Sequence, residues 1–328
     1  MTAVSATILL VAISLDLIIG DPRYPLHPVR LIGHLIHLLE KILRRLGLDS
    51  YIGGGLLLIL STVIPVSTWS SLYFLFSDIN WLPELWTIFL VYSCLGMGDL
   101  IRHARPIAKA LERHDLPLAR ERVSWIVGRD VSQLYESGIA RAAIESVAEN
   151  FVDAFLAPVF WFGCGAILFA HTGGDPLLGG GLAILVHRVA NTLDAMVGYR
   201  NERYRKLGCA SARCDDLLNF IPARLSIPLI SLAALISGND ARKAIRTGCR
   251  DRKNHPSPNS AHGESTVAGA LDIALGGPTP YPYGTVDKPW LNAEGHPAEA
   301  TDISKTMRLT TVSAIISGIL IAGILWIT

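Results

Sequence analysis

Long apolar runs separated by short polar segments constrain this chain more than any other feature. The C-terminal run, residues 309–328, reads LTTVSAIISGILIAGILWIT and contains no charged residue. A membrane-spanning helix needs about 20 mostly apolar residues. Runs near that length recur along the chain, at 3–19, 52–76, 84–98, 151–171, 177–198, 221–238 and 309–328. Only 17% of the residues are charged, against about one quarter in a typical soluble domain. We therefore predict an all-α, polytopic helical bundle that forms one integral membrane domain over residues 1–328.

The positions of Lys and Arg predict the orientation of this bundle. Of the 29 Lys and Arg residues, only Arg188 and Arg224 lie within the apolar runs, and the short connections 77–83 and 172–176 contain none. Because basic segments stay on the cytoplasmic side, four segments are predicted to be cytoplasmic: 21–51, 99–150, 199–220 and 239–308. Run 177–198 then crosses the membrane and run 221–238 re-enters without crossing. In the alternative, 221–238 is a true span and 172–220 lies outside.

Two of the polar segments have a predictable local character. Residues 105–130, with RPIAKALERHDLPLARERVSWIVGRD, have the pattern of an amphipathic helical surface. Residues 275–300 include GGPTPYPYG, and this Gly and Pro content predicts a loop. The N-terminal run lacks a basic leader and a small-residue cleavage site, so we interpret it as a retained membrane helix.

Three carboxylates stand four residues apart where the run 151–171 begins. Glu145, Glu149 and Asp153 fall on one face of a helix at this spacing. Like charges so arranged repel each other unless a cation lies between them. The stripe therefore indicates either bound Mg²⁺ or a cationic substrate group, or a solvated helix face next to the membrane.

Two further polar groups lie in and after the run 177–198. In HRVANTLDAM, Arg188, Asn191 and Asp194 share a face inside an apolar run, where ionisable residues usually have a function. A buried Arg188–Asp194 pair that only joins helices is the structural alternative. In RCDDLLNFIPARL, adjacent carboxylates and an amide suit Mg²⁺, and flanking arginines suit phosphate; helix capping is the alternative. This second group comprises Asp215, Asp216 and Asn219, flanked by Arg213 and Arg224.

A rigid polar loop precedes a small-residue segment in NHPSPNSAHGESTVAGAL. His255, Ser257 and Asn259 alternate with prolines, and the following segment is predicted to be helical. A loop of this kind before a helix N-terminus suits anion binding. Glu264, inside the helical segment, is interpreted as a helix cap or a metal ligand.

Other functional classes find no support in the sequence. The net charge of +1 gives no basic field for nucleic acid, so we expect no nucleic-acid partner. The chain contains no G-x-x-x-x-G-K-[ST] loop and no G-x-S-x-G around Ser257, which argues against standard P-loop and serine-hydrolase sites.

Four motifs in this order closely resemble the family of adenosylcobinamide-phosphate synthases (CobD/CbiB family), integral membrane enzymes of cobalamin biosynthesis. They are LDLIIGDPRYPLHPVRLIGHLI, ARAAIESVAENFVDAFLAPVFW, NTLDAMVGYRNERYRKLGCASARCDDLLNFIPARL and HPSPNSAHGESTVAGAL. The resemblance runs from about residue 15 to 285. Members commonly have Ala-Gly after the Asn of the last motif, where this chain has Ser260-Ala261.

The resemblance implies an ATP- and Mg²⁺-dependent ligase of the inner membrane with a cytoplasmic active site. Its substrates would be a corrinoid, adenosylcobyric acid, and an amino-alcohol phosphate, either aminopropanol phosphate or ethanolamine phosphate. Membrane lipids and other membrane enzymes of the pathway are the expected partners. An acyl phosphate is the expected intermediate, because a carboxylate accepts an amine poorly until it is activated.

Within this framework the polar residues receive predicted roles. Asp215, Asp216, His255 and Glu149 are candidate catalytic residues, with His255 or a carboxylate taking the proton of the amine. The candidate nucleotide- and phosphate-binding residues are Arg188, Asn191, Arg213, Arg224, Ser257 and Asn259. The candidate metal ligands are Glu145, Glu149, Asp153, Asp194, Asp215, Asp216 and Asn219.

Two alternatives remain open from the residues alone. A Mg²⁺-dependent membrane prenyl or phosphoalcohol transferase also suits D-D-x-x-N, although it needs a second Asp-rich motif. A non-catalytic membrane sensor is the other alternative, but polar groups are dense across four segments of the chain.

Overall fold

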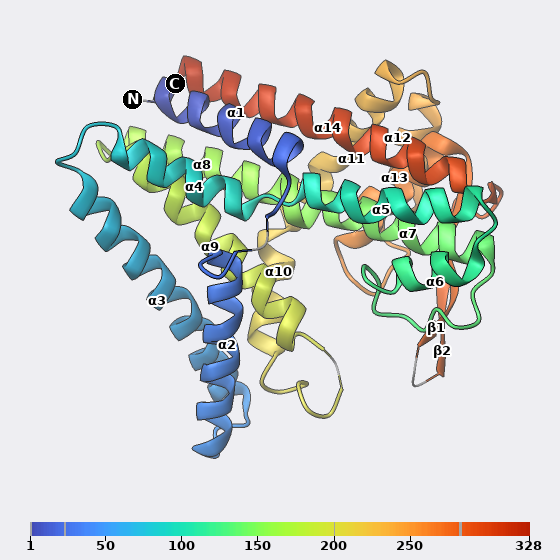
Figure 1. The fold of residues 1–328 in the computed structure, drawn as a ribbon, viewed down its shortest axis with the longest axis horizontal. Coiled ribbons are helices and arrows are strands. Elements are labelled where there is room, and N and C mark those ends of the chain that lie inside the picture. Colours follow the sequence, from blue (N-terminus) through green and yellow to red (C-terminus); the bar gives the residue numbers. More distant parts are fainter. Residues whose placement is uncertain (1, 23, 200, 282–283) are drawn as a thin grey trace. The chain divides into compact units, whose positions relative to one another are not determined.

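The computed structural model describes residues 2–22, 24–199, 201–281 and 284–328, and these divide into two compact units built from interleaved segments (Figure 1). Unit 1 comprises Met1–Gly96, Ala157–Leu218 and Gly318–Thr328. Unit 2 comprises Met97–Leu156 and Asn219–Ser317. The chain passes from one unit to the other at four points: after residue 96, after residue 156, after residue 218 and after residue 317.

The described residues of unit 1 form helices and the connections between them, without a strand. Its helix α9 contacts α1, α2, α3, α4, α8 and α10, so α9 forms the centre of this unit. The helices of unit 1 are α1 (Thr2–Ile19), α2 (Pro28–Arg45), α3 (Tyr51–Phe76), α4 (Leu82–Cys94), α8 (Ala157–His171), α9 (Pro176–Val197) and α10 (Cys209–Leu218). The last turns of α14 (Ala300–Ile327) also belong to this unit.

Glycines allow α8 and α9 to pack closely. A Cβ atom on Gly165 would lie 2.2 Å from the carbonyl oxygen of Gly179, and one on Gly179 would lie 2.4 Å from that of Gly165. Small residues at facing positions are typical of helix pairs in membranes, because they let the two backbones approach. The two helices therefore meet backbone to backbone.

Unit 2 combines helices with a small sheet. Its helix α13 is buried along all 12 residues and contacts α7, α11, α12, β1 and β2. Its helices are α5 (Met97–Glu112), α6 (Leu116–Val123), α7 (Glu136–Phe151), the π-helix η1 (Val152–Leu156), α11 (Phe220–Ile236), α12 (Ala241–Asp251) and α13 (Ser260–Leu271). The first turns of α14 also belong to this unit. The strands are β1 (Ile273–Tyr281), β2 (Gly284–Leu291) and β3 (His296–Pro297).

The prediction of a loop over residues 275–300 is wrong, because β1 and β2 pair antiparallel and β1 pairs with β3 in parallel. Positive φ angles at Gly276 and Gly277 accompany a register shift between Gly276 and Pro278. The carbonyl oxygens of Pro278 and Pro280 accept bonds from Arg141 and from the backbone of Asp130. Proline has no N–H group to donate to a strand ladder, and β1 pairs with β3 only at Ile273 and Ala274, so Pro278 and Pro280 lie where β1 has a single partner strand. The turn residues Pro282 and Tyr283 lie outside the described residues.

The helical membrane fold is confirmed. Among the described residues, five helices are long and apolar enough to cross a membrane, or six if α10 and α11 count as one broken span. Helix α9, which covers the predicted span 177–198, is not among them. Whether 221–238 re-enters or crosses stays a prediction. These five are α1 (Thr2–Ile19), α3 (Tyr51–Phe76), α4 with α5 (Leu82–Glu112), α7 with η1 and α8 (Glu136–His171), and α14 (Ala300–Ile327).

Candidate functional site

Glu145 joins three segments of unit 2. It is buried on α7, where its carboxylate accepts hydrogen bonds from Arg129 and from the backbone N–H of Gly276, the latter at 2.7 Å. Arg129 lies in the connection before α7 and Gly276 lies in β1. Both carboxylate oxygens therefore already have donors, and the charge of Arg129 offsets that of Glu145.

Glu149 lies one turn further along α7 and contacts the start of α13. The hydroxyl group of Ser260 donates a 2.7 Å hydrogen bond to its Oε1 atom. Asp153, the third member of the predicted stripe, lies in η1. A π-turn contains more residues than an α-turn, so the spacing assumed for the stripe applies to Glu145 and Glu149 but not beyond them.

Glu264 adds a third carboxylate from a different helix. It lies on α13 and is 4% exposed. Burial, followed by the charges of Glu149 and Glu145, raises the pKa of Glu264 well above its ordinary value of 4.5. Unit 2 therefore gathers three carboxyl groups, Glu145, Glu149 and Glu264, into one region that we call the acidic site.

His255 faces the acidic site from the loop before α13. Burial and then the positive charge of Lys288 lower the pKa of His255, although Glu149 and Glu145 act in the opposite direction. Its Nδ1 atom accepts the backbone N–H of Ser257 at 3.0 Å, and its Nε2 atom lies 3.4 Å from Nζ of Lys288. The lowered pKa favours the neutral ring, and the ammonium group of Lys288 beside Nε2 opposes its protonation.

Arg224 borders the same loop. Its Nη1 atom donates to the carbonyl oxygen of Phe220 at 2.6 Å and lies 3.4 Å from Oδ1 of Asn259. Asn259 ends the loop, and α13 begins at the next residue, as the sequence predicts. Arg224 and the N-terminus of α13 together place positive potential beside the loop.

Unit 1 holds a second polar group between α9 and α10. Nδ2 of Asn191 donates to Oδ1 of the buried Asp215 at 3.3 Å, and Nη1 of Arg188 donates to Oδ1 of Asn191 at 3.4 Å. Two of the groups quoted from the sequence are thus brought together. Asp194 lies one turn after Asn191 on α9, Asp216 is half-buried on α10, and Arg213 is exposed there.

The predicted site residues are shared between the units. Arg188, Asn191, Asp194, Arg213, Asp215 and Asp216 belong to unit 1, and the other predicted site residues belong to unit 2. The D-D-x-x-N motif is itself divided, because α10 ends at Leu218 and Asn219 is the N-cap of α11. That all these residues serve one site stays a prediction.

Comparison with known proteins decides the family. A family model described as CobD/Cbib protein matches residues 9–310. This chain belongs to the CobD/CbiB family.

Curated members of the family are similar along almost their whole length. "Cobalamin biosynthesis protein CobD" of Klebsiella pneumoniae subsp. pneumoniae is 41% identical over 318 residues, 96% of this chain and 95% of the relative. The protein of the same name from Citrobacter koseri is 43% identical, covering 92% and 91%. "Cobalamin biosynthesis protein CbiB" of Salmonella typhimurium is 41% identical with the same coverage. No solved structure matches significantly.

The acidic site of this CobD/CbiB chain suits Mg²⁺ in chemistry. Among the described residues, no three His, Cys, Asp or Glu side chains are already arranged to hold a metal ion. Mg²⁺ is usually held by one or two carboxylates together with substrate phosphates, and not by a cage of protein ligands. Glu149 and Glu264 supply oxygen donors of the kind that such an ion needs, and a bound cation would favour the ionised form of Glu264.

Three residues at the acidic site were missed by the sequence analysis. Arg129, Ser260 and Lys288 contact Glu145, Glu149 and His255, respectively. Each lies far from its partner or in a segment without a motif. Of the three, only Ser260 is distinguished in the sequence, because it departs from the usual pattern of the family.

Proposed function

We propose that this chain joins the carboxylate of adenosylcobyric acid to the amine of aminopropanol phosphate, or of ethanolamine phosphate, in an ATP-dependent reaction that gives adenosylcobinamide phosphate. Membership of a family of cobalamin biosynthesis proteins supports the pathway. The observation that carries the chemistry is the burial of Glu264 beside Glu149 and Glu145. Such an accumulation of carboxyl groups favours a bound cation and, with it, phosphate.

The reaction proceeds in two balanced steps. A carboxylate oxygen of the corrinoid attacks the γ-phosphorus of ATP, which forms an acyl phosphate and releases ADP. The neutral amine then attacks the acyl carbon, the C–O bond to phosphate breaks, and the amine loses a proton. The chain must therefore hold phosphates in line with the carboxylate and must accept one proton.

Acidic and basic residues of unit 2 suit the first requirement. Glu149 and Glu264 would hold Mg²⁺, which when bound offsets the charge of the transferring phosphoryl group. Ser260 fixes one oxygen of Glu149, and Lys288 and Arg224 provide positive charge beside the loop. Arg129 holds Glu145 in place and leaves it less suited to a metal.

The proton is better accepted by a carboxylate than by His255. Nδ1 of His255 already accepts the Ser257 N–H, and burial together with the charge of Lys288 beside Nε2 opposes protonation of the ring and lowers its pKa. We therefore assign His255 to orienting the loop before α13. The carboxylate of Glu149, half-buried and hydrogen-bonded, is the base that this arrangement favours.

The polar group of unit 1 is proposed to bind further phosphate and metal. Arg188 and Arg213 would contact phosphate oxygens. Asp215 and Asp216 would contact the metal, with Asn191 fixing the orientation of Asp215. The cytoplasmic face of the inner membrane is the proposed location of the reaction, because the basic segments are predicted to be cytoplasmic.

The test is reconstitution of the full-length protein with ATP, Mg²⁺, adenosylcobyric acid and each amino-alcohol phosphate. Mass spectrometry should detect the corrinoid amide, together with ADP in equal amount. Product formed without ATP would contradict the ligase mechanism. Detection of AMP in place of ADP would indicate that the intermediate is an acyl adenylate and not an acyl phosphate. No corrinoid product under any condition would contradict the proposal and favour a transferase or a sensor.

A further inference from the structure

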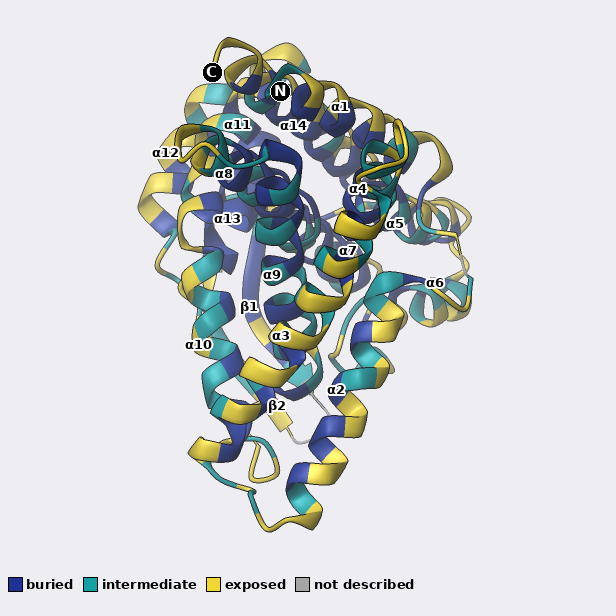
Figure 2. Cartoon of the chain, turned by 90° about the vertical axis from the view of Figure 1, so that its left-hand side faces the viewer, coloured by how far each residue is buried: buried dark blue, intermediate teal, exposed yellow. Residues whose placement is uncertain are grey.

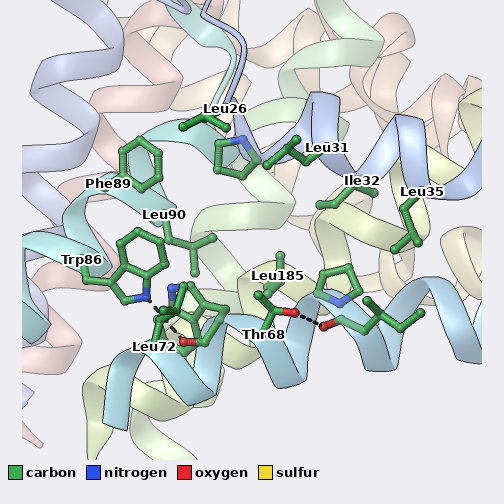
Figure 3. A pocket seen from close by; sticks show the side chains of 14 residues that line it. Leu26, Leu31, Ile32, Leu35, Thr68, Leu72, Trp86, Phe89, Leu90 and Leu185 are labelled. Atoms are coloured by element: carbon green, nitrogen blue, oxygen red, sulfur yellow. Dashed lines mark hydrogen bonds between the residues drawn. The ribbon is translucent and has the colours of Figure 1, made fainter. Parts of the chain in front are cut away.

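An apolar cavity in unit 1 is lined by none of the residues assigned above. It has a volume of about 350 Å³ and is lined by α2, α3 and α4, by Leu26 of the loop before α2, and by Leu185 of α9 (Figure 3). Volumes of about 300–1,000 Å³ are typical of ligand pockets. Leu31 and Leu35 point into it from α2, Thr68 and Leu72 from α3, and Trp86 from α4. Thr68 adds almost no polarity, because its hydroxyl group donates to the carbonyl of Ile64 in its own helix.

Helix α2 continues the apolar wall beyond the cavity. Leu31, Leu35, Leu38 and Ile42 recur at helical spacing, and three of them are exposed while Leu35 is half-buried. A neighbouring stripe, which includes Ile36 and Leu43, is buried in unit 1. Figure 2 shows the exposed positions along α2. The helix thus has more apolar surface than the unit itself covers, as helices that lie at a membrane surface do.

The end of the same helix carries a basic cluster. His37, Lys41 and Arg45 of α2 surround a second hollow, in which Arg203 joins Arg44 and Glu40. Four cations line this hollow together with Glu40, which is bonded to Arg44 and Arg203, and Arg44 also pairs with Asp49. Lys41 and Arg45 form no ion pair with any described residue. The cluster therefore has positive charge to offer an anion.

The cavity and the basic cluster are close enough for one ligand. Leu35 and Arg44 are separated by about 14 Å along the helix axis at 1.5 Å per residue, and the exposed Leu38 and Ile42 lie between them. A ligand that matches this surface has an apolar chain joined to an anionic head. In a protein of membrane-spanning helices, that description fits an anionic phospholipid.

We propose that α2 and the adjoining cavity form a binding site for an anionic phospholipid. One acyl chain occupies the cavity between α2, α3 and α4, and the phosphate head contacts Lys41, Arg45 and Arg203. Lys and Arg residues next to a membrane favour binding to an anionic lipid surface. The site fixes α2 at the membrane surface and does not depend on the proposed ligase activity.

The test uses tryptophan quenching by brominated lipids. Trp69 and Trp86 line the cavity, so lipid with brominated acyl chains should quench them when bound. We expect the full-length protein in nanodiscs to be quenched more strongly by brominated phosphatidylglycerol than by brominated phosphatidylcholine at equal mole fraction. The variant Trp86→Phe should lose part of the quenched fluorescence. Equal quenching by the two lipids, or none, would overturn the proposal.

Charge variants separate the site from general attraction to anionic membranes. The double change Lys41→Gln/Arg45→Gln should weaken the preference for phosphatidylglycerol at least fivefold. A matched pair of exposed arginines on α12 is available as the control, Arg242→Gln/Arg246→Gln. This control should leave the preference unchanged, and an equal loss in both variants would overturn the proposal. Thr68→Phe, which fills the cavity, should abolish the quenching that Trp86 reports, and undiminished quenching would contradict acyl-chain binding there.

Discussion

The hydroxyl group of Ser260 donates a 2.7 Å hydrogen bond to Oε1 of Glu149, although the two residues are 111 positions apart. This contact ties the start of α13 to the acidic stripe of α7. It also lies at the position where the chain departs from the usual pattern of its family. The bond fixes the orientation of the carboxylate that we propose as metal ligand and base.

Replacing Ser260 by Ala should therefore slow the proposed ligation without abolishing it. A hydrogen bond to a charged group contributes about 1.5–3 kcal/mol, and we expect kcat to fall about tenfold, since about 1.4 kcal/mol corresponds to a factor of ten. Ser265→Ala is the matched control, because the Ser265 hydroxyl group bonds to the carbonyl of Ala261 in the same helix. Steady-state kinetics of both variants checks this, and an unchanged kcat in Ser260→Ala would show that the bond has no catalytic role.

Glu264→Gln should stabilise the protein and inactivate it. The folded state raises the pKa of Glu264, so the folded state binds this proton more tightly than the unfolded chain does. The contribution of Glu264 to stability is therefore lost as pH rises above 4.5, because the unfolded chain releases this proton and the folded protein retains it. We expect the variant to unfold a few degrees higher, at about 2–4 °C per kcal/mol, with no detectable product.

Thermal unfolding in detergent at pH 8 and pH 5 measures this effect, which should shrink at the lower pH. The exposed Glu299→Gln serves as the control. A lower melting temperature for Glu264→Gln at pH 8 would contradict the assignment of Glu264 as an unfavourably buried acid.

His262 should contribute a loss of stability below pH 6.5, opposite in sign to the contribution of Glu264. Burial and then the charge of Arg224 lower the pKa of His262 to about 4. Between pH 6.5 and 4 the unfolded chain takes up a proton that the folded protein refuses, so the free energy of unfolding falls by up to about 1.4 kcal/mol per pH unit. Above pH 6.5 this contribution is constant.

The melting temperature of the variant His262→Gln should rise relative to that of the wild type as the pH falls from 7.5 to 5. The exposed His296→Gln should leave the dependence as in the wild type. If the melting temperatures of all three proteins depend on pH with the same slope, His262 does not cause the acid sensitivity.

The close approach of α8 and α9 predicts a severe effect of a single methyl group. In Gly165→Ala the added Cβ would meet the Gly179 carbonyl oxygen at 2.2 Å, so the helices must separate. Overpacking of this kind costs about 1–3 kcal/mol. In Gly323→Ala on α14 the Cβ meets no atom within 4 Å, and this control should be neutral or slightly stabilising. Melting temperatures of both variants test the helix contact, which a neutral Gly165→Ala would disprove.

Alanine at Asp215 or Asp216 should abolish turnover while the protein still inserts into the membrane. Loss of Asp215 also leaves Nδ2 of Asn191 without the acceptor recorded for it. The exposed Asp78→Ala, in the connection after α3, is the control for a change of charge. Product formation is measured alongside the amount of protein in the membrane fraction, and wild-type activity in either variant removes that aspartate from the metal role.

Sequence alone determined the membrane class, most helix positions, the distribution of cations and the family. These properties follow from local patterns, namely apolar runs of spanning length, helical spacing and contiguous motifs. The loop prediction for residues 275–300 failed because strand pairing depends on a partner segment, and Gly and Pro content cannot reveal that partner. The stripe prediction held only to Glu149, because a π-turn replaces the α-helical spacing at Asp153.

The tertiary structure decided what each acidic residue does. In the folded protein Arg129 and the backbone N–H of Gly276 donate hydrogen bonds to Glu145. Ser260 donates one to Glu149, and Glu264 is buried near both carboxylates. The physical reason is that a carboxylate's chemistry depends on its desolvation and on its neighbours' charges. Both are set by the packing of α7 against α13, two helices separated by more than a hundred residues of chain.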